Sequence, residues 1–238
     1  MRLFYRVDNS GRHSLVRSST LDSLATLIMA SCAIVVTIVV VSRRGASDGL
    51  PSRNTADVQL TPESWATLLS EGVQAGPSEA PAQLVVFADF QCPACRGFNG
   101  TVLPKLRARF KDDLSVRYRH WPLGYHSEAV PAALASECAK QQGRFWEFHD
   151  TLYSQQSALG VKSYAQLAHE AGVPDTSLLN HCMQDPATID PIERDRQLAE
   201  TLGSEGTPTI LLNGVLLRSG SLEGVLSDRI AELVGAGT

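Results

Sequence analysis

Hydrophobic and polar positions follow a strand–helix order in the C-terminal two thirds of the chain. A continuous apolar run over residues 84–88 is typical of a strand buried on both faces, as in a parallel sheet between helices. An amphipathic helical pattern follows, in which Pro104 should introduce a kink. Residues 114–119 then alternate between apolar and polar side chains, which predicts a half-exposed strand.

Helical spacing dominates the middle of the chain, and Gly143 is of the residue type that ends helices. Asn213-Gly214 lies between two apolar runs and predicts a β-hairpin, after which an amphipathic helix closes the chain. The whole pattern predicts an α/β domain over residues 81–238, with a helical insertion over about residues 126–203.

The N-terminal part of the chain holds an uncharged, mostly aliphatic run over residues 24–41, which is long enough to cross a bilayer as a helix. Four arginines precede the run and three follow it closely, a weak bias toward a cytoplasmic N-terminus. We therefore expect a cytoplasmic tail at 1–23 and a single-pass signal anchor at 24–42, with the body on the periplasmic or outer side of the cell membrane. A cleaved signal peptide is the alternative.

Residues 43–80 are predicted to form a linker that contains one short helix. The stretch over 45–53 is small and polar and contains a proline. Thr61-Pro62-Glu63 combines the residue types of an N-cap, a first-turn proline and a first-turn acid, so the helix should begin there.

Composition and charge narrow the class of protein. The chain has 238 residues, of which 43% are hydrophobic, and a net charge of −4. Residues 1–44 hold six arginines against two aspartates, so the negative charge lies in the remainder of the chain. An acidic body offers no electrostatic surface to a polyanion, which argues against a nucleic-acid partner. Five cysteines are too few for a small scaffold held together by disulfides.

The chemistry is carried by Cys92-Pro93-Ala94-Cys95, which stands between the buried strand and the first helix. Cys92 should lie at the helix N-terminus, where unpaired N–H groups and the positive end of the dipole stabilise a thiolate. Cys95 follows one turn later and should be more buried, with a higher pKa. We therefore expect Cys92 to attack a sulfur of the substrate and Cys95 to resolve the mixed disulfide.

Two alternatives for this cysteine pair stay open. A metal-binding or metallochaperone module could use Cys92 and Cys95, although a closed zinc site needs two more ligands and the nearest histidines of the body are His120 and His126. A structural interaction domain on a membrane stalk could carry the pair as an inert bridge. The prediction that we favour, a redox site, requires no metal or other cofactor.

Three segments resemble the DsbA-like branch of the thioredoxin superfamily: the active-site strand and turn, the cis-proline loop and a stretch of the inserted helical domain. These are residues 85–95, 206–209 and 142–150. The resemblance spans about residues 60–236. It implies a thioredoxin fold interrupted by a helical domain, and a thiol–disulfide oxidoreductase that acts on protein substrates and is recycled by a membrane redox partner.

The resemblance also implies roles for single residues. A cis bond between Thr207 and Pro208 would place that loop against Cys92, and the backbone of Thr207 could pair with a substrate strand. Thioredoxin-like proteins often bury an acid six residues before the first active-site cysteine, where this chain has Val86. Asp89 is the nearest acid and a candidate for proton transfer, with a solvated or capping carboxylate as the equal alternative.

Cys138 and Cys182 form a second pair in the helical block, each on an apolar stripe. In an oxidising compartment such cysteines are candidates for a structural disulfide, and related DsbA-like proteins sometimes carry one. Two buried free thiols are the alternative. A distance of more than about 7 Å between the two Cα atoms would exclude the bridge.

Overall fold

The computed structural model describes residues 57–217 and 222–236, together with the strands β1 (Tyr5–Val7) and β2 (His13–Leu15). The chain divides into two units, Met1–Asn54 and Thr55–Thr238. β1 and β2 pair with each other in antiparallel orientation within the predicted tail. The predicted membrane anchor lies outside the described residues, and within those residues no helix combines the length and the apolar character that a bilayer span requires.

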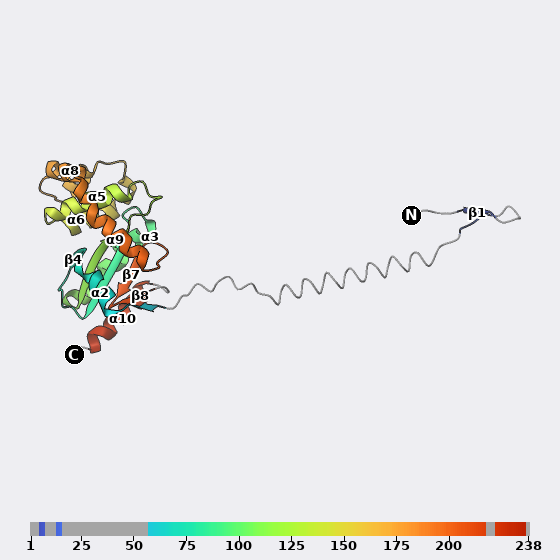
Figure 1. The fold of residues 1–238 in the computed structure, drawn as a ribbon, viewed down its shortest axis with the longest axis horizontal. Coiled ribbons are helices and arrows are strands. Elements are labelled where there is room, and N and C mark those ends of the chain that lie inside the picture. The colour runs from blue at the N-terminus through green and yellow to red at the C-terminus, as the bar shows by residue number, and fades with distance from the viewer. Residues whose placement is uncertain (1–4, 8–12, 16–56, 218–221, 237–238) are drawn as a thin grey trace. The chain divides into compact units, whose positions relative to one another are not determined.

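Six strands of the second unit form one mixed sheet (Figure 1). Their spatial order is β3 (Val58–Gln59), β8 (Val215–Leu217), β7 (Thr209–Leu212), β5 (Ala82–Ala88), β6 (Leu114–His120) and β4 (Val73–Ala75). The central strand β5 runs parallel to β6 and antiparallel to β7, with Val86 opposite both Tyr118 and Ile210. The predicted hairpin is present between β7 and β8, where Asn213 and Gly214 both have positive φ.

Helices cover both faces of the sheet. The side chains of β5 alternate between two apolar layers, and six of its seven residues are at most 1% exposed. One layer is completed by α3 (Pro93–Gly97), the π-helical segment η1 (Phe98–Val102), α4 (Leu103–Phe110) and α10 (Leu222–Ala236). The other is completed by α2 (Pro62–Ser70) and α9 (Asp190–Thr201). An apolar run without alternation is what burial on both faces requires.

The domain begins earlier in the chain than the sequence predicts. Residues 57–80, assigned above to the end of the linker, contain the edge strands β3 and β4 and the helix α2. The helix has the expected start, with Thr61 as its N-cap and Pro62 in its first turn. Leu68 of α2 is 1% exposed against the sheet, and burying a leucine contributes about 2 kcal/mol. Strands of two and three residues are too short for a periodic pattern, which is why the sequence places no strand here.

The first long helix changes geometry earlier than expected. The sequence predicts a kink at Pro104, whereas the structure is π-helical over Phe98–Val102, and the amide of Leu103 donates to the carbonyl of Phe98. Pro104 then falls in the first turn of α4, where its missing N–H needs no partner. The irregular turn lies directly after the helix that carries Cys95, and π-helical insertions are frequent near functional sites.

A block of helices separates β6 from β7 in the chain. It consists of α5 (Ala129–Gln141), α6 (Phe145–Ser154), α7 (Tyr164–Glu170), α8 (Thr176–Gln184) and α9, with the short 3-10 helices η3 (Gln156–Ala158) and η4 (Pro186–Ile189) between them. A further 3-10 turn, η2 (Lys111–Asp113), precedes β6. In Figure 1, α5, α6 and α8 lie together at the end of the domain away from β8 and α10. Gly143, with a φ of 70°, follows α5 and ends it.

Strand β6 is buried on both faces, so the prediction of a half-exposed strand is wrong. Ser115 is 7% exposed and Arg119 is 2% exposed. The guanidinium of Arg119 forms an ion pair with Asp195 of α9, at 2.6 Å between Nε and Oδ1, and also donates to the carbonyl of Leu68. A buried charge is tolerated when it has such partners, and the partner on α9 could not be found from the polar alternation of the strand.

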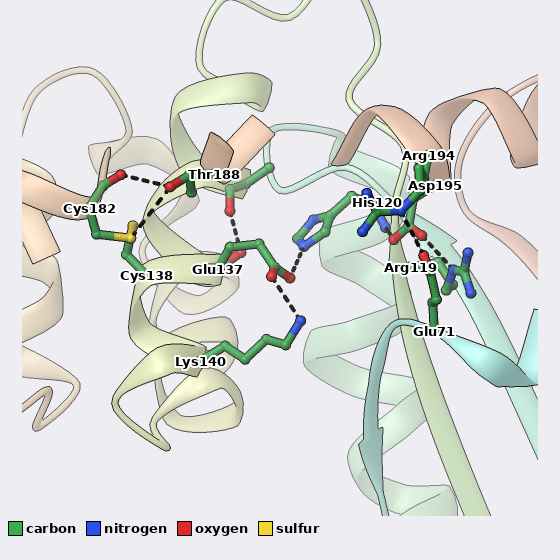
Figure 2. A network of polar contacts seen from close by, with 12 residues as sticks. Glu71, Arg119, His120, Glu137, Cys138, Lys140, Cys182, Thr188, Arg194 and Asp195 are labelled. Atoms are coloured by element: carbon green, nitrogen blue, oxygen red, sulfur yellow. Dashed lines mark hydrogen bonds and ion pairs between the residues drawn. A yellow bond between two sulfur atoms is a disulfide. The ribbon is translucent and has the colours of Figure 1, made fainter. Parts of the chain in front are cut away.

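Figure 2 shows how two neighbouring residues of β6 connect the sheet to the helical block. The backbone amide of His120 donates to Asp195 at 2.7 Å, and its Nε2 lies 3.1 Å from Oε1 of Glu137 on α5. Burial opposes ionisation of Glu137, but its hydrogen bonds with His120 and Lys140 outweigh that effect and lower its pKa to about 2. The sheet therefore contacts both α9 and α5 through buried polar groups.

The second cysteine pair lies in the same view. Cys138 of α5 and Cys182 of α8 are joined by a disulfide with 5.7 Å between their Cα atoms, well inside the limit given above (Figure 2). The hydroxyl of Thr188 in η4 donates to the carbonyl of Cys182 at 2.8 Å. The disulfide thus links α5 covalently to α8.

Candidate active site

The first cysteine pair lies where β5 ends and α3 begins. Cys92 is the N-cap of α3 and Pro93 is the first helical residue, which needs no partner for a backbone N–H. The carbonyl of Cys92 accepts from the amide of Arg96 at 3.1 Å, which starts the helical ladder. Cys92 is 7% exposed and Cys95 is fully buried, and both are free thiols.

The loop before β7 lies against this pair. The Thr207–Pro208 peptide bond is cis, and the sulfur of Cys92 lies 3.4 Å from the carbonyl oxygen of Thr207, to which it donates when protonated. The hydroxyl of Thr207 is buried and makes no hydrogen bond to any other described residue, yet it acts on both sulfurs and lowers the pKa of each. Residues 115 positions apart in the chain thus meet at the sulfur of Cys92, where the resemblance places them.

The two sulfurs differ strongly in acidity. The hydrogen bond from the Cys95 thiol is the largest cause that lowers the pKa of Cys92, to about 5, and the Thr207 hydroxyl and the amides of Ala94 and Cys95 act in the same direction against the effect of burial. Burial raises the pKa of Cys95 well above its ordinary value, and its hydrogen bond to Cys92 raises it further. Cys92 is therefore ionised at neutral pH, whereas Cys95 keeps its proton.

Asp89 supports the turn before Cys92. It is 2% exposed, so it is not a solvated carboxylate. Its Oδ1 accepts from the amide of Gln91 at 2.7 Å, and its Oδ2 accepts from the amide of Leu123 at 2.9 Å and lies 2.7 Å from Nδ1 of His126. These contacts make it a capping group for two loops. The proposed part in proton transfer stays a prediction, since none of these bonds leads to a sulfur.

Polar side chains from the helical block also hold the active-site turn, and the sequence analysis did not identify them. The amide of Gln156 in η3 donates to the carbonyls of Phe90 and Cys92, at 2.8 and 2.9 Å. Gln91 accepts from the amide of Glu128 at 2.7 Å. A glutamine more than sixty residues away from the cysteines carries no signal in a single sequence, because only the fold brings it to the site.

The surroundings of Cys95 are aromatic. Val86, at the position where relatives often have an acid, is fully buried. The hydroxyls of Tyr118 and Tyr153 lie 3.0 Å apart, and Tyr153 donates to the carbonyl of Asp89 at 3.4 Å. Burial raises the pKa of both tyrosines well above the ordinary value, so both remain protonated and neutral. No carboxylate thus replaces the missing acid at this position among the described contacts.

The arrangement does not favour a metal centre. Within residues 57–217 and 222–236, no group of three or more His, Cys, Asp or Glu side chains is placed to hold a metal ion. The two histidines considered above are engaged elsewhere, His120 with Glu137 and His126 with Asp89. What the site offers is one acidic thiol, one buried thiol and a cis-proline loop.

Comparison with known proteins agrees with this chemistry. A family model described as Thioredoxin matches residues 69–227, the segment that holds the cysteine pair, the helical block and the Thr207–Pro208 loop. Disulfide bond formation protein D of Bacillus subtilis strain 168 is 26% identical over 152 residues, which are 60% of this chain and 68% of that protein.

A second group of relatives consists of longer proteins. The Na(+)/H(+) antiporter NhaA of Herminiimonas arsenicoxydans is 36% identical over 163 residues, which are 68% of this chain but only 25% of that protein. The matching segment is thus about a quarter of the length of such a relative.

A solved structure extends the likeness to the whole domain. The thioredoxin-like oxidoreductase from Silicibacter pomeroyi DSS-3 is 25% identical to this chain, with a TM-score of 0.60, and the match covers 73% of this chain and 97% of that one. The chain therefore belongs to the thioredoxin family.

Proposed function

We propose that this chain is a membrane-anchored, extracytoplasmic enzyme that exchanges disulfides with protein substrates through Cys92 and Cys95. The observation that carries the proposal is the difference between the two sulfurs: the pKa of Cys92 is about 5, and that of Cys95 is raised. A thiolate is both the attacking species and the better leaving group in disulfide exchange, so the two cysteines are suited to different steps.

The exchange takes two balanced steps. When the protein acts as oxidant, a substrate thiolate attacks the sulfur of Cys92 in the Cys92–Cys95 disulfide, forms a mixed disulfide and displaces Cys95, which takes up a proton because of its high pKa. A second thiolate of the substrate then attacks the substrate sulfur and releases Cys92 as a thiolate. Two electrons pass from the substrate to the cysteine pair, and the reverse sequence reduces a substrate disulfide.

Thr207 is our candidate for the substrate-binding position. Its backbone precedes the cis peptide bond to Pro208 and contacts the sulfur of Cys92, at the start of strand β7. An extended substrate segment that pairs with this backbone would bring its own cysteine to Cys92 by strand addition. Main-chain pairing does not depend on a particular side chain of the substrate, which suits an enzyme that acts on many proteins.

The proposed location rests on the sequence. The uncharged run over residues 24–41, with arginines on both sides, supports a single membrane span that leaves the domain outside the cytoplasm. Disulfides such as Cys138–Cys182 persist in oxidising compartments, which agrees with that side of the membrane. There, a membrane redox partner would return the Cys92–Cys95 pair to its working state after each turnover.

Trapping in cells tests the catalytic part of the proposal. In Cys95→Ser the resolving thiol is missing, so mixed disulfides between Cys92 and protein substrates should accumulate as high-mass species that dithiothreitol releases. The double variant Cys92→Ser/Cys95→Ser is the matched control and should capture nothing. If the single variant captures no more protein than the double variant, the catalytic proposal fails.

Labelling of intact cells tests the location. A maleimide that cannot cross membranes should modify, before lysis, the Cys92 of those Cys95→Ser molecules that are not in a mixed disulfide, and the product should remain in the membrane fraction. Labelling that appears only after lysis would contradict an extracytoplasmic domain, and recovery in the soluble fraction would contradict the anchor.

A further inference from the structure

A buried polar chain leads from the backbone of Cys95 to the protein surface. Asn99, in the π-helical segment η1, is 2% exposed, and its Nδ2 donates to the carbonyl of Cys95 at 3.0 Å. Its Oδ1 lies 3.3 Å from Nε2 of His149 on α6. Nδ1 of His149 lies 2.8 Å from Oδ1 of Asp150, whose side chain is 63% exposed. The disulfide-exchange steps described above use none of these three side chains.

Chemistry fixes which of these polar groups donate and which accept. The carbonyl of Cys95 only accepts, so the amide of Asn99 turns its NH₂ group toward Cys95 and its oxygen toward His149. The carboxylate of Asp150 also accepts. Each ring nitrogen of His149 therefore faces an acceptor. A neutral imidazole has one N–H and satisfies one of the two contacts, whereas the imidazolium satisfies both.

The hydrogen bonds of His149 favour its protonated form, whereas its surroundings disfavour that form. The ring is 1% exposed and packs against the aromatic rings of Phe90, Tyr118, Phe145, Trp146 and Tyr153. Burial lowers the pKa of His149, Asp150 raises it, and the charges of Arg107 and His120 lower it. These are the titratable and charged groups that act on the ring from α4, β6 and α6. The hydrogen bonds therefore favour the imidazolium, and burial favours the neutral imidazole.

Protons can reach Asp150, the outermost of these three side chains, from solvent. Asp150 and Asn99 both line a cleft of about 730 Å³ that extends to Pro93 and Arg96 of α3. The same two residues line a second cleft of about 460 Å³ beside Arg107. The exposed carboxylate of Asp150 therefore connects the buried imidazole to water.

We propose that His149 is a proton-dependent positioning residue for Cys95, which it holds through the side chain of Asn99. This inference rests on the proposed function, because it assigns a control over the step in which Cys95 attacks the mixed disulfide on Cys92. With a proton on Nε2, His149 donates to Asn99 and fixes the amide that binds the Cys95 carbonyl. Without that proton, the oxygen of Asn99 faces the lone pair of Nε2. The side chain of Asn99 is then less firmly placed, and its hydrogen bond to the Cys95 carbonyl is weaker.

The test follows the closure step in the full chain. The reduced protein is mixed with oxidised glutathione, quenched in acid and analysed by mass spectrometry, so that the Cys92–glutathione disulfide and the closed Cys92–Cys95 disulfide are counted separately between pH 5 and 8. The wild type should show a step in the closure rate, superimposed on the rise caused by ionisation of the Cys95 thiol. The step should be about threefold to tenfold, which corresponds to one buried hydrogen bond.

Three variants separate the proton from the packing. His149→Gln supplies an N–H toward Asn99 that does not titrate, so the step should vanish while closure continues. Asp150→Asn leaves the core intact and removes the group that raises the pKa of His149, so the step should move to lower pH. His181→Gln, at an exposed histidine of α8, is the matched control and should behave as the wild type.

The outcomes are distinguishable. A step that persists unchanged in His149→Gln, or that stays in place or moves to higher pH in Asp150→Asn, overturns the inference. If His149→Gln fails to fold, Asp150→Asn and an NMR titration of the His149 ring in the wild type still decide it, because the ring must titrate at the midpoint of the step. If the wild type forms no glutathione adduct at Cys92, the proposed function itself fails.

Discussion

The chain carries two cysteine pairs with the same chemical groups and opposite surroundings. Cys92 and Cys95 stand one helical turn apart after the end of the central strand β5, as free thiols of very different acidity. Cys138 and Cys182 lie 44 residues apart on two helices of the inserted block and are bonded to each other. The first pair is arranged to exchange its bond and the second to keep it.

Loop length and local polarity together decide what each cysteine pair does. A bridge between neighbours such as Cys92 and Cys95 closes a small loop and restricts the unfolded chain little, whereas a bridge across 44 residues restricts it by several kcal/mol. Conversely, the active pair has donors around its first sulfur: the Cys95 thiol, the Thr207 hydroxyl and two backbone amides. At the bonded pair, the hydroxyl of Thr188 donates to the carbonyl of Cys182 and lies 3.7 Å from its sulfur.

Cys92→Ser should give the largest effect and should separate the two pairs. Removing the nucleophile should lower disulfide-exchange activity by about 10³-fold or more, because the reaction has no other route. The free energy of unfolding should change little below about pH 4, where Cys92 is a neutral thiol and serine is close to it in size. At higher pH the variant also loses the stability that the ionised thiol contributes. Insulin reduction and urea unfolding measure the two quantities. Full activity in the variant would remove Cys92 from the reaction.

The double variant Cys138→Ala/Cys182→Ala is the converse experiment. We expect the free energy of unfolding to fall by about 2 to 5 kcal/mol, because the unfolded chain regains the entropy of an open loop. Insulin reduction under conditions where the variant is still folded should stay near the wild-type value. Loss of activity in a demonstrably folded variant would show that the two pairs are not independent.

The pH dependence of stability tests the link between the sheet and the helical block, where Glu137 precedes Cys138 on α5. The folded-state pKa of Glu137 is about 2, below its ordinary value of 4.5. Its contribution to stability is therefore present above about pH 4.5 and is lost as the pH falls toward 2, and it amounts to about 3 kcal/mol. Chemical unfolding between pH 6 and 2.5 measures this loss.

Glu137→Gln should flatten that profile relative to the wild type. Glu147→Gln is the matched control, since Glu147 lies on α6 in an exposed ion pair with Arg144 that contributes little. Equal slopes for the wild type and Glu137→Gln would mean that the buried contacts of Glu137 do not stabilise the fold.

The two regions were predictable from the sequence to different degrees. The strand before Cys92, the start of α2 at Thr61 and the Asn213-Gly214 hairpin follow from local patterns and agree with the structure. The burial of Arg119 and the edge strands β3 and β4 do not, because they depend on an acid of α9 and on pairing with distant strands. Short strands and buried charges are decided by tertiary partners.

The site shows the same division. The sequence predicts an acidic Cys92 from its place at a helix start, and the family resemblance adds Thr207 and Pro208. In the structure, the hydrogen bond from the Cys95 thiol is the largest cause of that acidity. The sequence alone could not show that Gln156 holds the active-site turn or that His149 reaches Cys95 through Asn99. The contacts of Gln156 with Cys92 and of His149 with Asn99 join residues whose separation in the chain is set by the helical insertion rather than by a motif.

Thr207→Val should have the smallest effect and isolates one of the groups around Cys92. The variant loses the hydroxyl that lowers the pKa of Cys92 but keeps the backbone contact and the shape of the side chain. Losing the dipole of this hydroxyl beside the thiolate should raise the pKa of Cys92 from about 5 toward about 6. Because a higher pKa leaves less thiolate at a given pH, alkylation by iodoacetamide should slow markedly at pH 5 and hardly at all at pH 7.5.

A matched control lies two residues further along. Thr209→Val removes a hydroxyl that donates to the carbonyl of Gly206 at 2.7 Å and is not among the groups that act on either sulfur. The midpoint of alkylation should therefore stay where it is in the wild type. An unchanged midpoint in Thr207→Val, or an equal displacement in Thr209→Val, would show that the Thr207 hydroxyl is not one of the donors that keep Cys92 ionised, and the acidity of the active pair would then rest on Cys95 and the backbone alone.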